Sequence, residues 1–127
     1  MKNQMKKIML YIMVLAYVLA GSYHFINPLF YVPFFPPYLK SYAHIFNAIA
    51  GFVEIILGIL LLWNKSRSIA GYGLILMLLA FIPAHIFMIE QAPFYLGSFY
   101  VTTLTAWLRL LVVHPLLIAM ILWARKI

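Results

Sequence analysis

Residues 45–63 read IFNAIAGFVEIILGILLLW, and this stretch decides the fold class because it contains a single charged residue, Glu54. A helix rises about 1.5 Å per residue, so about 20 apolar residues cross the roughly 30 Å hydrocarbon core of a membrane. Three further stretches of this kind lie at about 8–25, 69–89 and 101–123. Spanning segments must satisfy their own backbone hydrogen bonds, which favours helices. We therefore predict an all-α membrane protein, a bundle of four transmembrane helices.

The composition excludes the common soluble classes. Of the 127 residues, 67% are apolar and only 9% are charged, against about 45–50% and about 25% in ordinary soluble domains. Disordered chains are poor in apolar residues, so disorder is excluded as well. The absence of cysteine excludes disulfide scaffolds and thiol chemistry. The length fits one domain, residues 1–127.

The basic residues predict the orientation in the membrane. Seven of them flank the spans on one side, if the chain crosses four times: Lys2, Lys6, Lys7, Lys65, Arg67, Arg125 and Lys126. Cytoplasmic loops are enriched in Lys and Arg, so both termini are expected in the cytoplasm. Such flanking charges form no stripe for nucleic acid, and the expected partner is the lipid bilayer. An alternative is a cleaved signal peptide that ends near Ala20.

The first loop, about 27–43, combines four prolines with six aromatic residues. Proline disfavours regular helix, and aromatic rings are enriched where a membrane meets water. Two interpretations stay open for this loop: a simple interfacial anchor, or a lid over a cavity.

Four ionisable residues are the candidate ligand-binding residues, namely His24, Glu54, His85 and Arg109. Ionisable groups inside a membrane are costly and usually face the bundle interior in pairs. Glu54 is the only acid within a span and Arg109 the only base, so we expect an ion pair between them. The pair either locks the helix packing or belongs to a polar site beneath the outer surface.

Five other residues are expected to have structural roles: Asn47, Gly51, Gly58, Pro83 and His114. The first three share a helical stripe with Glu54, and its small residues permit close helix approach. Pro83 frees a carbonyl one turn back, which His85 or a neighbour is placed to cap. His114 is expected off the face of Arg109, because five residues turn a helix by about 140°.

Known chemistry motifs do not appear in the chain. No His-x-x-x-His or Glu-x-x-His pair occurs within a predicted helix, so neither a metal site nor a haem site is predicted. There is also no phosphate-binding glycine loop or nucleophile elbow. The catalytic residues, and whether the chain is an enzyme at all, are left open.

Several motifs follow one another along the chain: Gly21-x-x-His24-Phe25-x-x-Pro28, Ala50-Gly51-x-x-Glu54-x-x-x-Gly58, Phe81-x-Pro83-Ala84-His85 and Leu108-Arg109-Leu110. Together and in this order, they resemble the DoxX-like family of small four-helix membrane proteins. The chain departs from the family pattern at His85, where Asn is expected, and at His114-Pro115, where the family more often has Pro-x-Gln.

The resemblance implies a location in the bacterial cytoplasmic membrane and a link to quinone-dependent oxidoreductases. Fold-level analogy does not settle chemistry, so three functions are compared. The first is a redox-associated subunit with quinone as its candidate cofactor and a membrane-protein or redox-enzyme partner. The second is a non-catalytic scaffold whose Glu-Arg pair is structural. The third is a transporter, which the lack of an inverted repeat disfavours unless a homo-oligomer supplies the pathway.

Overall fold

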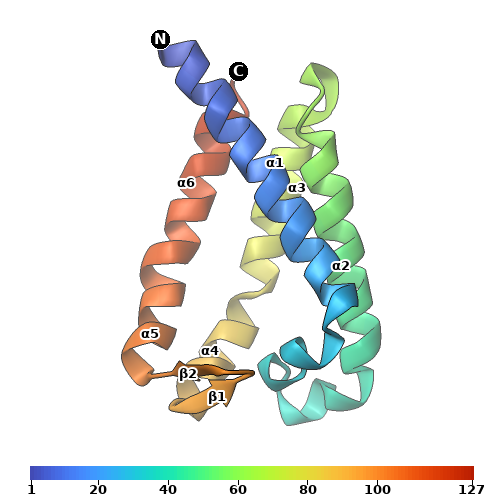
Figure 1. Cartoon of the computed structure of the whole chain (residues 1–127), viewed down its shortest axis with the longest axis vertical. Coiled ribbons are helices and arrows are strands. Elements are labelled where there is room, and N and C mark those ends of the chain that lie inside the picture. Colours follow the sequence, from blue (N-terminus) through green and yellow to red (C-terminus); the bar gives the residue numbers. More distant parts are fainter.

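The four predicted spans are helical in the computed structural model, which describes residues 1–127 (Figure 1). The first is α1 (Lys2–Ile26) and the second is α2 (Ala43–Leu60). The third consists of α3 (Asn64–Ala80) and α4 (Ile82–Gln91). The fourth consists of α5 (Thr103–Leu108), the π-helical turn η3 (Arg109–Val113) and α6 (His114–Ala124). All four are long and apolar enough to cross a membrane.

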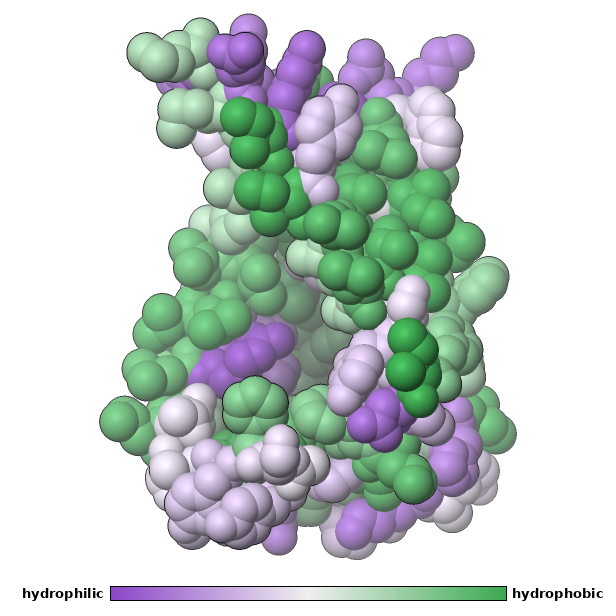
Figure 2. All heavy atoms as spheres, in the orientation of Figure 1, coloured by the Kyte–Doolittle hydropathy of each residue, from purple (hydrophilic) through white to green (hydrophobic).

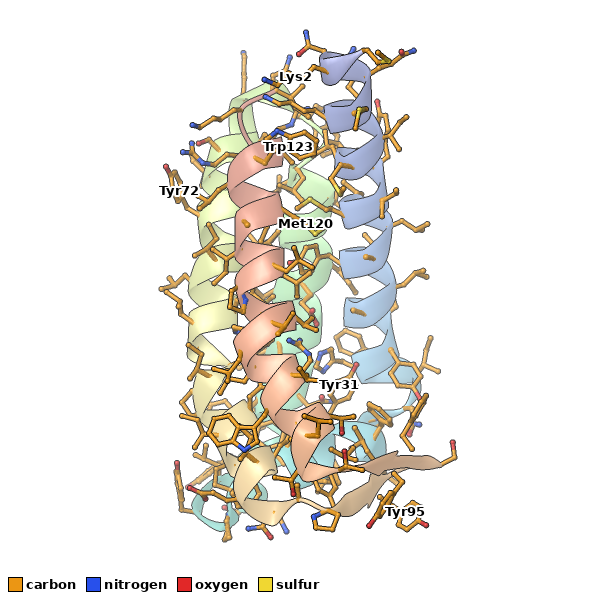
Figure 3. The ribbon with its side chains drawn as sticks, turned by 90° about the vertical axis from the view of Figure 1, so that its left-hand side faces the viewer. Lys2, Tyr31, Tyr72, Tyr95, Met120 and Trp123 are labelled. Atoms are coloured by element: carbon orange, nitrogen blue, oxygen red, sulfur yellow. The ribbon has the colours of Figure 1, made fainter.

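Both termini lie at one end of the bundle, here called the terminal end (Figure 1). The opposite end, here called the hairpin end, carries the connections after the first and third spans. Figure 3 separates Lys2 and Trp123 at the terminal end from Tyr95 at the hairpin end. An even number of helical spans that run up and down the bundle accounts for this arrangement.

Glycines allow α1 and α2 to pack closely. A Cβ added at Gly51 would lie 2.7 Å from His24 Cβ and 2.8 Å from Gly21 O. A Cβ at Gly58 would lie 3.0 Å from Tyr17 Cβ. Small residues at such positions let two helix backbones approach, as the stripe on the second span predicts.

The buried apolar core occupies the half of the bundle nearer the termini. Its members come from all four spans, and Leu61, Leu74 and Ile121 are the largest that are fully buried. Most buried polar side chains lie outside this core: His24, Asn47, Glu54, His85 and His114. The outer surface of the helices is largely apolar, as Figure 2 shows.

The hairpin end contains structure that the sequence did not reveal. The proline-rich loop forms two 3₁₀ helices, η1 (Pro28–Phe34) and η2 (Pro37–Tyr42). Two short strands, β1 (Phe94–Leu96) and β2 (Phe99–Val101), pair antiparallel with Tyr95 opposite Tyr100. Gly97 in their turn has a φ of 61°, which glycine adopts without strain.

Arg67 is buried at the terminal end, although its charge was expected to mark only the orientation. Its guanidinium donates to Leu61 O at 2.8 Å, Leu62 O at 3.0 Å and Asn64 Oδ1 at 2.8 Å. It also donates to Ile127 O at 3.3 Å. These carbonyls follow the end of α2, so Arg67 caps that helix and ties it to the end of the fourth span.

Candidate functional site

His24 and Asn47 join the first two spans at the hairpin-end half. Asn47 Nδ2 donates to His24 O at 2.8 Å, which turns Asn47 Oδ1 toward the ring. His24 Nδ1 lies 2.6 Å from that oxygen. An amide oxygen only accepts, so Nδ1 of His24 carries a hydrogen. Asn47, predicted as structural, thus fixes the orientation of the imidazole.

The structure pairs Glu54 with His24. Nε2 of His24 lies 2.8 Å from Glu54 Oε2, and both side chains are buried. Two lone pairs at this distance would repel, which favours a proton on one of the two atoms. The contact between His24 Nε2 and Glu54 Oε2 does not have the geometry of an aligned hydrogen bond, and Glu54 Oε2 has no other hydrogen-bond partner.

The prediction of a direct ion pair between Glu54 and Arg109 is therefore wrong, since no carboxylate lies within 4.0 Å of the Arg109 guanidinium. The prediction used only the charges of these two residues, and charge does not give the direction in which each helix faces. The short α1–α2 distance at Gly21 and Gly51 brings His24 to Glu54 first.

Arg109 begins the π-helical turn of the fourth span. The backbone N–H of His114 donates to Arg109 O, five residues earlier. This wide turn precedes Pro115, which has no backbone N–H to continue the regular helix. It lets Arg109 Nη1 approach His114 Nδ1 to 3.3 Å. The expectation that His114 lies off the Arg109 face was wrong because it assumed a regular α-helix.

His114 also reaches the break in the third span. Its Nε2 donates to Leu78 O, just before α3 gives way to α4. Its Nδ1 is then left as an acceptor for Arg109. The residue that caps this break is thus His114 and not His85, whose ring packs edge-on against His114 with centroids 5.1 Å apart. Nδ1 of His85 is buried without a partner.

A cavity of about 200 Å³ lies between the first and fourth spans. Glu54 and Arg109 both line it, together with the apolar or aromatic residues Ala16, Tyr17, Ala20, Leu78, Phe81 and Leu117. Figure 2 shows a hollow on this face, with apolar side chains on both sides and hydrophilic atoms at its edge. The Tyr17 hydroxyl is buried and has no hydrogen-bond partner.

The 3₁₀ helix η1 covers the polar pair from the hairpin end. The Tyr31 ring stacks on the His24 ring, with centroids 3.8 Å apart and planes 11° apart. Figure 3 shows Tyr31 next to the helices, between Tyr95 and the middle of the bundle. Burial, Glu54 and Tyr23, in that order, raise the pKa of Tyr31 to about 12. The neutral Tyr31 ring thus covers His24 on the side of the hairpin end.

The structure brings three of the four predicted site residues together. Glu54 and Arg109 line the cavity, and His24 contacts Glu54 from the first span. His85 does not line the cavity. Tyr17 and Tyr31 were not predicted as site residues, although Tyr17 lies four residues before Gly21 and seven before His24, on the same face of α1. The described side chains contain no group of three metal-ligating residues.

A family model described as "Domain of unknown function (DUF8561)" matches residues 13–127. The chain belongs to this family. The matched range includes every site residue above, from Tyr17 to His114. No curated protein and no solved structure matches the chain.

Proposed function

We propose that the chain is a multi-pass membrane protein whose hairpin-end half binds a small lipophilic molecule with a hydrogen-bonding headgroup. The candidate ligand is a quinone. In this proposal both termini are cytoplasmic, and the membrane is the bacterial inner membrane.

The four helices and the charge distribution support the membrane part of the proposal. Each span lies in a helical segment of at least 22 residues, which for the second span runs from Pro37 to Leu60, and each segment contains a strongly apolar stretch of 18 residues. Most Lys and Arg residues lie at the terminal end, and such residues favour the cytoplasmic side. Aromatic residues at the hairpin end suit a membrane interface.

The cavity carries the binding part of the proposal. A carboxyl group and a guanidinium line one hollow inside an otherwise apolar bundle. Such groups are costly inside a membrane and usually mark a functional site. An apolar cavity of about 150 Å³ holds a benzene molecule, so about 200 Å³ suits a single substituted ring. A longer tail would lie in the surrounding lipid.

The resemblance to DoxX-like proteins supports a quinone in particular. That family is named after a membrane subunit of a thiosulfate:quinone oxidoreductase. Quinone oxygens accept hydrogen bonds, and Arg109 and Tyr17 both offer donors in the cavity. The sequence has no motif for a redox cofactor, so a partner protein would supply or receive the electrons.

Thermal unfolding of the purified protein in detergent tests this proposal with a short-chain ubiquinone and with menadione. We expect at least one quinone to raise the midpoint, and Glu54→Gln and His24→Ala to abolish the increase. Glu90→Gln is the matched control, because Glu90 is the only other acid and is exposed. No increase with any quinone, together with a stoichiometric co-purifying membrane protein, would favour the scaffold function instead.

A further inference from the structure

Arg109 is a cationic group in the cavity without an acidic partner. The chain has two acids, and Glu90 is exposed at the end of α4. The other acid, Glu54, contacts His24. The one side-chain partner of Arg109 is Nδ1 of His114, an uncharged acceptor, because Nε2 of that ring donates to Leu78 O. A guanidinium keeps its proton, and no carboxylate lies within 4.0 Å of this one.

A second donor lies on the same cavity. The Tyr17 side chain is 7% exposed, and its hydroxyl has no hydrogen-bond partner. Tyr17 and Arg109 come from α1 and η3, which border the hollow from opposite sides. Buried polar groups in folded proteins almost always have a hydrogen-bond partner. An unpaired tyrosine hydroxyl beside a guanidinium that contacts no carboxylate therefore indicates a missing hydrogen-bond acceptor.

The missing acceptor can arrive from the lipid. Helices α1 and α6 approach each other at the terminal end and diverge toward the hairpin end (Figure 1). The hollow in Figure 2 lies in this gap. Ala16, Ala20 and Leu117 give it small or apolar walls. These walls suit the hydrocarbon part of an amphiphile, while its headgroup reaches Arg109 and Tyr17.

We propose that the cavity selects a lipophilic molecule whose headgroup carries an anionic oxygen, which Arg109 and Tyr17 receive together. This inference rests on the proposed function and narrows its ligand class. Two sources share the required chemistry: an acidic hydroxyquinone and a long-chain carboxylate. Glu54 contacts His24 and lies more than 4.0 Å from the Arg109 guanidinium, so the guanidinium is free to receive the anion.

The test compares a hydroxynaphthoquinone, whose ring hydroxyl is ionised at neutral pH, with its methyl ether, which has the same ring and no charge. Binding is measured on the full chain in nanodiscs of zwitterionic lipid. A charge-assisted hydrogen bond is about twice as strong as a neutral one, so we expect the anion to bind at least about tenfold more tightly. Oleate, as a competitor, tests the carboxylate source.

Variants assign the preference to its residues. Arg109→Gln should remove the preference, so that the anion and the methyl ether bind with equal affinity, whereas Arg109→Lys should keep part of the preference. Tyr17→Phe should weaken binding of the anion more than binding of the methyl ether. Arg125→Gln is the control, because it removes a cation that contacts Tyr72 at the terminal end.

The outcomes separate this inference from the proposed function. Equal affinities for the two naphthoquinones, with no competition by oleate, would overturn the anion preference and leave quinone binding in place. Binding of none of the three molecules would overturn both proposals. Competition by oleate that Arg109→Gln abolishes would support the anion preference and identify a carboxylate as its source.

Discussion

Nε2 of His24 lies 2.8 Å from Glu54 Oε2, so the one buried acid is paired across the α1–α2 contact. This pair is placed by a close helix crossing, because Gly21 and Gly51 leave no room for a side chain between the backbones. Packing and electrostatics therefore depend on the same two helices, and variants can separate them.

Removal of one member of the pair should destabilise the fold. His24→Leu leaves Glu54 buried without its partner, and loss of one partner of a buried ion pair typically costs about 3–5 kcal/mol. The double variant His24→Leu/Glu54→Leu should recover part of this loss, because no unpaired charge remains. Unfolding in denaturant measures the free energies. Equal losses in the single and double variants would mean that the pairing does not stabilise the fold.

The glycine contact predicts a second difference in stability. Gly51→Ala places a methyl group 2.7–2.8 Å from the His24 Cβ and the Gly21 carbonyl, which are fixed atoms. Overpacking of this kind costs about 1–3 kcal/mol. Gly73→Ala is the matched control, since its nearest atoms are the terminal carbons of Leu57, at 3.0 and 3.1 Å, which can move. A larger loss at Gly73 than at Gly51 would contradict the close α1–α2 contact.

Arg67 should matter more than its neighbouring lysine. Arg67→Met leaves the Leu61 and Leu62 carbonyls without donors, and an unsatisfied buried group costs about 1–3 kcal/mol. Lys65→Met removes the same charge from the same turn at the start of α3, but Lys65 is exposed. Thermal unfolding of the two variants compares a cap with a simple surface charge. Similar midpoints would show that the cap contributes little.

Regular features were predictable from the sequence, and irregular ones were not. Four apolar stretches predicted four helices, and the small residues near Glu54 predicted a close contact. Hydropathy does not specify which helix faces Glu54, so the prediction that Arg109 is the ion-pair partner of Glu54 was wrong. The π-helical turn at Arg109 was also not predicted, because a pattern with a fixed helical period has no place for the extra residue of such a turn. The short β1–β2 hairpin has too few residues to show an alternating pattern.

The raised pKa of Tyr31 predicts how the stability of the fold changes at alkaline pH. Its pKa is raised to about 12, above the ordinary value of 10.0, with burial as the main cause. A phenol with a higher pKa in the folded state contributes stability below pH 10 and loses it as the pH rises toward 12. Tyr31→Phe should therefore lose less stability than the wild type over this interval. Unfolding midpoints at several alkaline pH values provide the measurement, and parallel curves would contradict the prediction.

The membrane orientation can be tested because the chain contains no cysteine. Single cysteines at Lys2 and Lys126 report on the terminal end, and one at Tyr95 reports on the hairpin end. If the termini are cytoplasmic, a membrane-impermeant maleimide should label only the Tyr95 position in intact cells. After lysis all three should react, which controls for accessibility. Labelling of Lys2 and Lys126 on opposite sides would require an odd number of crossings and would overturn the four-span topology. Labelling of both in intact cells would reverse the orientation that the Lys and Arg residues predict.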